Sequence, residues 1–301
     1  MRVSYSGRPP AARKVIAADL VGARCLTVIM NERAILVLGG TGTVGRRLVA
    51  RLRDAGAPVR AASRHGDVRF DWSAPPTWEP ALAGADRLFL MAPDGIAVEP
   101  AFVELAVESG VRRVVLLSSR GIEAMGDERL LAAEATVRGS GADWTILRAD
   151  WFDQNFDEGF FQRAVMAGEL ALPLGDLRQA FVDAGDIAAA AAAVLTSEGH
   201  GGRRYDVTGP RPLSFAAAVE IIARVAGRPV RYLGTVDDYL AQQQAIGVPP
   251  EAAEGAAAAF TALAETGDAE PSDDVRRLTG RLPLSFETYA AGAAAAGAWS
   301  D

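Results

Sequence analysis

The sequence predicts an α/β fold, in which a doubly wound parallel sheet is followed by a smaller, mostly helical C-terminal lobe. Three observations support this prediction. Short apolar runs alternate with helical patterns, a glycine-rich turn follows the first run, and the alternation loosens after Arg148. Alternating strands and helices are typical of βαβ units, whose strands pair in parallel. With 301 residues, half of them apolar, the chain can form a large domain and a smaller lobe.

The first predicted strand, residues 34–38, is a continuous apolar run of the kind expected for a strand buried on both faces. Further strands are predicted at residues 58–62, 68–70, 87–91, 113–117 and 144–147, with helices at 43–55, 98–109 and 128–139 between them. After Arg148, two short strands at 204–207 and 230–233 lie among longer helices. Alanine-rich stretches at 188–193, 255–259 and 290–297 favour helix.

A glycine-rich turn connects the first strand to the first helix. Gly39 allows a sharp turn, Gly42 lets the backbone approach a pyrophosphate, and Gly45 lets the helix pack close to the sheet. The free N–H groups at the helix start, at the positive end of its dipole, would hold the anion. We therefore predict a Rossmann-type dinucleotide-binding turn made of Gly39, Thr41, Gly42, Thr43, Val44 and Gly45.

The end of the second strand favours NADP(H) over NAD(H). An NAD site would place an Asp or Glu there, whereas this chain has Ser63 and Arg64, which suit a 2′-phosphate. The alternative is that Arg64 is a solvated loop charge. Later strand ends add further expected contacts: Asp71 for the adenine amino group, Trp72 beside the ring, and Met91, Ala92 and Pro93 beneath the ribose and nicotinamide.

Three domains follow from this pattern. Residues 1–29 are predicted to be a disordered N-terminal extension before a plausible start at Met30, residues 30–150 the dinucleotide-binding core, and residues 151–301 a substrate-binding lobe with returning elements of the core. A signal peptide is the rival interpretation of the extension, but Asp19 and Arg24 interrupt its apolar region.

Composition narrows the possible functions. The net charge of −7 argues against nucleic-acid binding, which needs a dense basic patch. The purely apolar stretches are too short to cross a membrane, so we expect a cytoplasmic protein. With Cys25 as the only cysteine, and only His65 and His200, neither a disulfide nor a metal cluster is expected. No heptad or interface motif indicates an oligomeric state.

Several motifs together resemble the NmrA-like group of atypical short-chain dehydrogenase/reductases. They are GGTGTVGR at 39–46, SSRG at 118–121, SGADWTILRADWFDQNF at 140–156, FVDAGDIA at 181–188, YDVTGPRPLSFAAAVEIIARVAGRPV at 205–230 and VRRLTGRLPLSF at 275–286. The resemblance covers nearly everything from Ala34 onward. Within the group the chain looks most similar to quinone, triphenylmethane-dye and ergot-alkaloid iminium reductases.

The resemblance implies a departure from the wider superfamily, whose members use a Tyr-x-x-x-Lys pair to protonate the substrate. The sole lysine of this chain is Lys14, and its tyrosines, Tyr5, Tyr205, Tyr232, Tyr239 and Tyr289, are not on the corresponding helix. If Glu134 is the glutamate that often follows the pair, the Tyr and Lys positions hold Gly126 and Leu130. We expect Glu134 to cap a helix or form a salt bridge.

Other residues are candidates for catalysis and substrate binding. Ser118 and Ser119, at the end of the fifth strand, could hydrogen-bond an acceptor oxygen or the nicotinamide ribose, or simply form a turn. Asp150 could donate or accept a proton if burial raises its pKa; otherwise it caps a loop or pairs with Arg148. The expected substrate-binding residues are Trp151, Phe152 and Phe156 as flat apolar walls and Asn155 as a polar group. Asp183 and Asp186 are assigned to a helix N-terminus.

Three functions are compatible with these features. The first is an NADPH-dependent reductase that transfers a hydride to an electron-poor aromatic, quinoid or iminium small molecule, in secondary metabolism. Such acceptors spread or neutralise the incoming charge, so catalysis depends largely on positioning. The second is a non-enzymatic NADP(H) sensor, and the third a non-redox isomerase, dehydratase or cyclase driven by Asp150 or the serines. The aromatic residues favour a small-molecule substrate.

Overall fold

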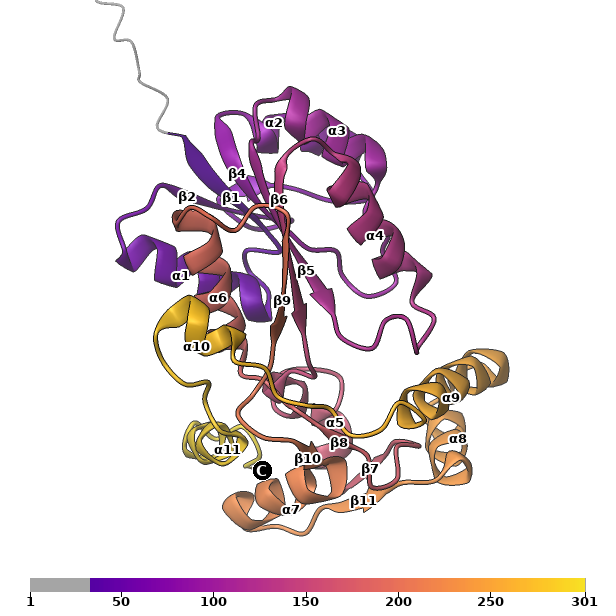
Figure 1. Cartoon of the computed structure of the whole chain (residues 1–301). Coiled ribbons are helices and arrows are strands. Elements are labelled where there is room, and N and C mark those ends of the chain that lie inside the picture. The colour runs from indigo at the N-terminus through magenta and orange to yellow at the C-terminus, as the bar shows by residue number, and fades with distance from the viewer. Residues whose placement is uncertain (1–32, 301) are drawn as a thin grey trace, which may run out of the picture. The chain divides into compact units, whose positions relative to one another are not determined.

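The computed structural model describes residues 33–300, and seven of the strands in this range form one parallel sheet (Figure 1). The order across it is β3-β2-β1-β4-β5-β6-β9. These strands are β1 (Ala34–Leu38), β2 (Val59–Ser63), β3 (Val68–Arg69), β4 (Ala85–Leu90), β5 (Arg113–Ser119), β6 (Asp143–Ala149) and β9 (Arg203–Val207). The order reverses between β1 and β4, and ligands of such sheets bind at the strands' carboxyl ends beside this reversal. The predicted doubly wound sheet is confirmed.

Helices cover both faces of the sheet because successive side chains of a strand point to opposite faces. Ile35 and Val37 belong to the core on one face, and Leu36 and Leu38 to the core on the other. The first face is covered by α1 (Thr43–Asp54), α6 (Ala184–Thr196) and α10 (Asp274–Thr279). The second is covered by α2 (Trp78–Leu82), α3 (Pro100–Glu108) and α4 (Glu128–Gly139), and the short helix η1 (Pro75–Thr77) packs on α2.

The alanine-rich helix α6 belongs to the sheet half although it follows the lobe segment in sequence. Its alanines at 188–192 are buried, and their small side chains let α6 pack closely on α1 and the sheet. Asp183 caps its N-terminus by accepting a hydrogen bond from Gly185 N at 2.8 Å. Asp186, in the first turn, accepts one from Leu284 N at 2.6 Å. The predicted structural role of both acids is confirmed.

The remaining elements form the lobe, which lies beyond the carboxyl ends of the central strands (Figure 1). They are η2 (Asp153–Phe156), α5 (Gln162–Met166), β7 (Glu169–Ala171), β8 (Arg178–Gln179), β10 (Leu213–Ser214), α7 (Phe215–Ala226), β11 (Arg231–Leu233), α8 (Val236–Ala245), α9 (Pro250–Ala264) and α11 (Phe286–Ala295). Its strands form two small two-stranded sheets, β10 with β8 and β11 with β7. Aromatic side chains dominate its core, including Phe156, Phe161, Phe181, Phe215 and Phe286.

The chain crosses between the sheet and the lobe more than once. The predicted strand at 204–207 is β9, which pairs with β6 at the edge of the central sheet instead of joining the lobe. The boundary between residues 150 and 151 stays a prediction, and the predicted extension 1–29 lies outside the described residues. Among the described helices, none is both long enough and apolar enough to cross a membrane.

Candidate functional site

A cavity of about 480 Å³ opens at the carboxyl ends of β1, β4, β5 and β6. It brings together segments that are far apart in sequence. Of the residues predicted for the site, those that line it are Gly39, Gly42, Thr43, Val44, Gly45, Met91, Ala92, Pro93, Ser118, Ser119, Asp150, Trp151, Phe152 and Asn155. The turn, the strand ends and the start of the lobe therefore share one space, where a nucleotide and a second small molecule could meet.

The glycine turn is shaped by two positions that exclude a side chain. Gly39 has a φ of +64°, and a Cβ there would lie 2.6 Å from Met91 Sδ. A Cβ on Gly45 would lie 2.0 Å from the carbonyl oxygen of Gly39. Gly42 is the N-cap of α1, no side chain caps this helix, and its first turn contains no acidic residue. The helix N-terminus therefore remains available to an anion, which fits a dinucleotide pyrophosphate.

The residues predicted for the adenosine end lie outside the cavity lining. The Ser63 hydroxyl accepts a hydrogen bond from His65 N at 3.1 Å, and Arg64 is exposed. The Asp71 carboxylate accepts hydrogen bonds from Ser73 Oγ at 2.7 Å and Ser73 N at 3.0 Å. These bonds, with Arg64 nearby, hold the pKa of Asp71 below its usual value. The adenine contact predicted for Asp71 would have to share this carboxylate with Ser73.

Trp72 and Thr41 also lie outside the cavity lining. The Trp72 ring meets the rings of Phe70 and Phe102 edge to face, each at a centroid distance of 5.1 Å. It thus packs against the aromatic residues of the core on the face of the sheet that α2 and α3 cover. Thr41 is exposed and lines a shallow groove with Arg53 and His65. The adenine contact of Trp72 and the role of Thr41 in the dinucleotide-binding turn stay predictions.

Glu134 is the centre of a buried ionic network beside the cavity. It is fully buried and accepts hydrogen bonds from Ser118 Oγ at 2.7 Å, Arg148 Nε at 2.7 Å and Arg138 Nη2 at 2.7 Å. Burial alone would raise the pKa of Glu134, but the bonds from Arg148 and Ser118 outweigh it and the pKa is lowered. Arg148 also makes a two-pronged contact with Glu123. Glu134 therefore forms a salt bridge, as expected, and holds the Ser118 hydroxyl as a donor.

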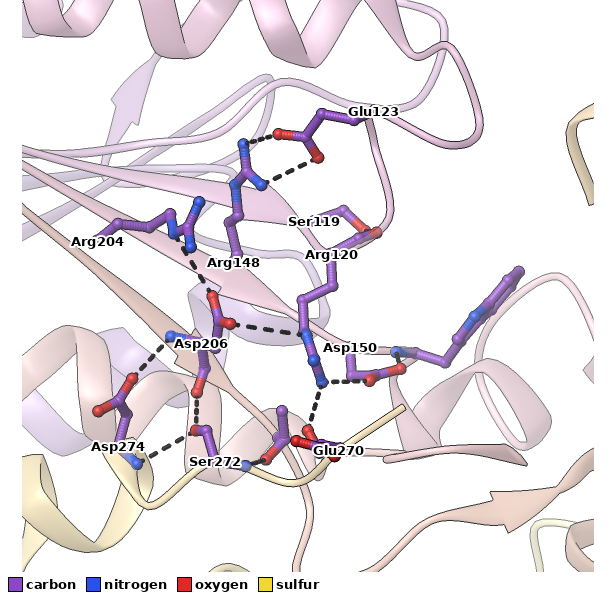
Figure 2. Close-up of polar contacts among 12 residues, drawn as sticks. Ser119, Arg120, Glu123, Arg148, Asp150, Arg204, Asp206, Glu270, Ser272 and Asp274 are labelled. Carbon is purple, nitrogen blue, oxygen red and sulfur yellow. Dashed lines mark hydrogen bonds and ion pairs between the residues drawn. The ribbon is translucent and has the colours of Figure 1, made fainter. Parts of the chain in front are cut away.

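Asp150 is paired with Arg120, a residue that the sequence prediction missed (Figure 2). Asp150 Oδ2 lies 3.1 Å from Arg120 Nη1, and Oδ1 accepts from Trp151 N at 2.8 Å. The expected pairing with Arg148 is thus corrected, because Arg148 is already held by Glu134 and Glu123. Burial raises the pKa of Asp150, while Trp151 N and Arg120 oppose the shift, and a catalytic role for Asp150 stays a prediction. The available signal for Arg120 was its position directly after β5.

A segment of residues 268–274 fixes Arg120 from the other side. Arg120 Nη1 donates to the backbone oxygen of Glu270 at 3.1 Å, and its Nε lies 3.9 Å from Asp206 Oδ2 (Figure 2). The segment is itself attached to β9, because Asp274 Oδ2 accepts from Asp206 N at 2.9 Å. Ser119, which precedes Arg120, donates its hydroxyl to the Arg120 backbone oxygen at 3.1 Å.

Aromatic residues at the start of the lobe form one wall of the cavity. Trp151 stacks on Phe161 at 5.8 Å and meets Phe160, which also lines the cavity and is 62% exposed. Phe156, expected as a wall, does not line the cavity. Its ring is fully buried and packs against the rings of Phe161, Phe181, Phe215 and Phe286 in the lobe core. Trp299 Nε1 donates to its backbone oxygen at 2.9 Å.

The aromatic wall is tied to the glycine turn by ion pairs. Glu158 lies beside the lining residues Gly159 and Phe160. It pairs with Arg47 at 2.8 Å and also with Arg46, both on α1. The ion pairs thus connect the lobe entrance to the helix whose N-terminus faces the cavity.

The four described tyrosines are engaged outside the cavity. Tyr289 donates to Asp157 Oδ1 at 2.9 Å, Tyr232 donates to the Leu172 backbone oxygen at 2.9 Å, Tyr205 hydrogen-bonds His200 Nδ1 at 2.9 Å, and Tyr239 is buried in the lobe core. Among the described residues that line the cavity, none is Tyr or Lys.

A family model described as NAD(P)H-binding matches residues 39–198. The chain belongs to this family. It is 33% identical over 284 residues to an NAD(P)H azoreductase of Xenophilus azovorans, covering 87% of this chain and 98% of the relative. It is 34% identical over 278 residues to the (4-alkanoyl-5-oxo-2,5-dihydrofuran-3-yl)methyl phosphate reductase of Streptomyces griseus, covering 85% and 96%.

The fold is shared with a solved structure, the Citrobacter triphenylmethane reductase complexed with NADP(H). The TM-score is 0.69 at 23% identity, covering 87% of this chain and 99% of that one. The resemblance to the NmrA-like group of atypical short-chain dehydrogenase/reductases is confirmed. Its family and relatives make this protein an NAD(P)H-dependent oxidoreductase.

Proposed function

We propose that this protein is an NADPH-dependent reductase that transfers a hydride to an electron-poor conjugated small molecule without a Tyr–Lys pair. One observation carries the proposal: a single cavity contains the glycine turn, two strand-end serines and an aromatic wall, while no described lining residue is Tyr or Lys. A phenolic acid is thus missing from the lining, and positioning must supply most of the catalysis. Positioning can remove about 7 kcal/mol or more of a barrier.

The cofactor fits the residues on one side of the cavity. The backbone N–H groups at the start of α1 would hold the pyrophosphate, while Gly39 and Gly45 leave the space that side chains would fill. Ser63 and Arg64 are proposed to bind the 2′-phosphate that distinguishes NADPH, and Ser118 and Ser119 to approach the nicotinamide ribose. Bound NADPH would supply the hydride.

The preference for NADPH can be tested at Arg64. We expect Arg64→Glu to weaken NADPH binding at least about tenfold while changing NADH binding much less, because the new carboxylate repels the 2′-phosphate. Intrinsic cofactor fluorescence during titration measures both dissociation constants. Equal losses for the two cofactors would remove Arg64 from the 2′-phosphate site.

The acceptor fits the aromatic part of the cavity lining. Trp151, Phe152 and Phe160 offer flat apolar surfaces, and Asn155 adds a polar group. The names of two relatives specify an azo acceptor and an oxodihydrofuran, both of which carry electron-poor conjugated bonds. We therefore propose a planar conjugated acceptor for this protein.

NADPH oxidation by the purified protein tests this function directly. We expect acceptor-dependent loss of the near-ultraviolet absorbance of NADPH with a member of a panel of quinones, enones, azo dyes and triphenylmethane dyes, and slower loss with NADH. Tight NADPH binding without oxidation of any acceptor would contradict the reductase proposal. That outcome would support the non-redox catalyst or the sensor.

A further inference from the structure

Arg120 and Asp150 leave neighbouring strands at the same level of the cavity. Ser119, the last residue of β5, pairs in register with Ala149, the last residue of β6. The backbone N–H of Arg120 continues this ladder by donating to the Ala149 oxygen at 2.9 Å. Both side chains line the cavity that contains the glycine turn. The pair therefore lies where a molecule bound beside the cofactor would be reduced.

Some N–H groups of the Arg120 guanidinium contact protein acceptors, and others remain available to a ligand. Its Nη1 contacts Asp150 and the Glu270 backbone, and its Nε faces Asp206. Across residues 33–300, no acceptor is found for Nη2. The side chain is 24% exposed. A guanidinium has five N–H donors in a fixed plane, so these contacts orient Arg120 and still leave N–H donors for a ligand.

Asp150 positions this guanidinium. Its side chain is only 2% exposed, and both carboxylate oxygens are occupied, one by Arg120 and the other by Trp151 N. Trp151 belongs to the aromatic wall, so the Asp150 contacts also set the distance between the wall and the Arg120 guanidinium. A pair held in this way needs little rearrangement when charge develops nearby.

We propose that Arg120 binds the conjugated oxygen of a carbonyl acceptor, a quinone or an α,β-unsaturated carbonyl compound, and stabilises the negative charge that this oxygen gains on reduction. The inference rests on the proposed reductase function and names its substrate class. The acceptor receives the hydride as a new C–H bond at its electron-poor carbon. Its π-electron pair moves to the oxygen, which Arg120 holds as an anion until water supplies the proton, and NADPH becomes NADP⁺.

This role favours carbonyl acceptors over cationic ones. Arg120 offers only N–H donors and no acceptor atom of its own, so it needs an acceptor atom on the substrate. A triphenylmethane dye or an iminium ion is a cation that hydride transfer makes neutral, and no anion forms that Arg120 could stabilise. The guanidinium would therefore stabilise the reduced acceptor by charge and hydrogen bonding, and not by proton transfer.

Two acceptors, one a neutral quinone and the other a cation, test the proposal. We expect Arg120→Met to lower kcat/KM for menadione by about 10²-fold, as when an oxyanion donor is removed, while kcat/KM for the malachite green cation is unchanged or raised. Arg224→Met is the matched control, because Arg224 is 70% exposed on α7 and pairs only with Glu220 in the described contacts. An equal loss for both acceptors, or no loss, would overturn the role of Arg120.

A measurement without turnover separates this proposal from the reductase function. We expect 4-nitrophenol, bound to the protein with NADP⁺, to ionise at a lower pH than free 4-nitrophenol, as its visible phenolate absorbance reports. The shift should disappear in Arg120→Met and increase in Asp150→Asn, where the carboxylate no longer competes for the guanidinium. No phenolate binding, or the same ionisation in wild type and Arg120→Met, would overturn the oxyanion site. If bound 4-nitrophenol still ionises at a lower pH but the protein reduces no quinone, the reductase function is overturned and the oxyanion site is retained.

Discussion

Two fully buried carboxyl groups, one beside the sheet and one in the lobe, have opposite charge behaviour. Glu134 accepts hydrogen bonds from Ser118, Arg138 and Arg148, and its pKa is lowered. Asp153 has no hydrogen-bond partner for either carboxylate oxygen among the described residues. Burial, together with the nearby charge of Asp183 and other acids, raises the pKa of Asp153 well above its usual value. The comparison shows that hydrogen-bond donors around a buried carboxyl group, and not burial itself, determine whether its pKa is lowered or raised.

The two groups therefore affect stability in opposite pH ranges. Glu134 has a lowered pKa in the folded state, so its stabilisation is present above the unfolded pKa of 4.5 and is lost as the pH falls through the folded pKa. Asp153 has a raised pKa in the folded state. Its cost is absent below the unfolded pKa of 3.8 and grows as the pH rises from there to the folded pKa.

The largest expected loss of stability follows from removing the Glu134 charge. Glu134→Leu leaves the Arg148 guanidinium, whose side chain is 9% exposed, with only Glu123 as a carboxylate partner in the described residues. We expect the free energy of unfolding to fall by about 3–5 kcal/mol, as when one partner of a buried ion pair is removed. Denaturant unfolding followed by circular dichroism measures the change.

Glu123→Gln is the matched control, because the Glu123 side chain is 58% exposed. It should lower the free energy of unfolding by about 1 kcal/mol or less. Similar losses for Glu134→Leu and Glu123→Gln would show that the buried network contributes no more than a surface pair.

The next substitution is expected to raise the free energy of unfolding instead of lowering it. We expect Asp153→Asn to stabilise the protein relative to wild type as the pH rises, since the amide cannot be forced to ionise in the core. Between the unfolded and folded pKa of Asp153, the difference should grow by about 1.4 kcal/mol per pH unit. Unfolding titrations at pH 4.5, 6 and 7.5 would measure it. A difference that is constant with pH would mean that Asp153 is ionised in the folded protein.

The smallest effect concerns Ser118, whose hydroxyl donates to Glu134 at 2.7 Å. Ser118→Ala removes one of several bonds to that carboxylate, so we expect a loss of about 1 kcal/mol. Because Glu134 then has a weaker set of donors, acid unfolding should begin at a slightly higher pH. Thermal unfolding between pH 4 and 7 would detect both changes, and an unchanged profile would contradict the contribution of Ser118 to the network.

Local patterns predicted the fold and the nucleotide turn well. The apolar run at 34–38, the glycine spacing and the helical period of Val44, Leu48 and Leu52 each involve near neighbours in sequence, and the structure reproduces all three. The steric requirement at Gly45 is also local, because the clashing oxygen belongs to Gly39, whereas the close contact at Gly39 is made by Met91 at the end of the neighbouring strand β4. The predicted Ser63, Arg64 and Asp71 contacts need the cofactor itself and stay predictions.

The sequence by itself determined the parallel sheet, the dinucleotide turn and two residues of the aromatic wall, Trp151 and Phe152, because periodicity and backbone sterics act over a few residues. Only the tertiary structure decided which charges meet. Arg148 and Asp150 are two residues apart, a spacing that puts both side chains on one face of a regular strand. However, β6 ends at Ala149, so Arg148 within the strand reaches Glu134, while Asp150 beyond its end meets Arg120. The same long-range packing buried Phe156, left Phe160 exposed at the cavity, and left the Asp153 carboxylate with no hydrogen-bond partner among the described residues.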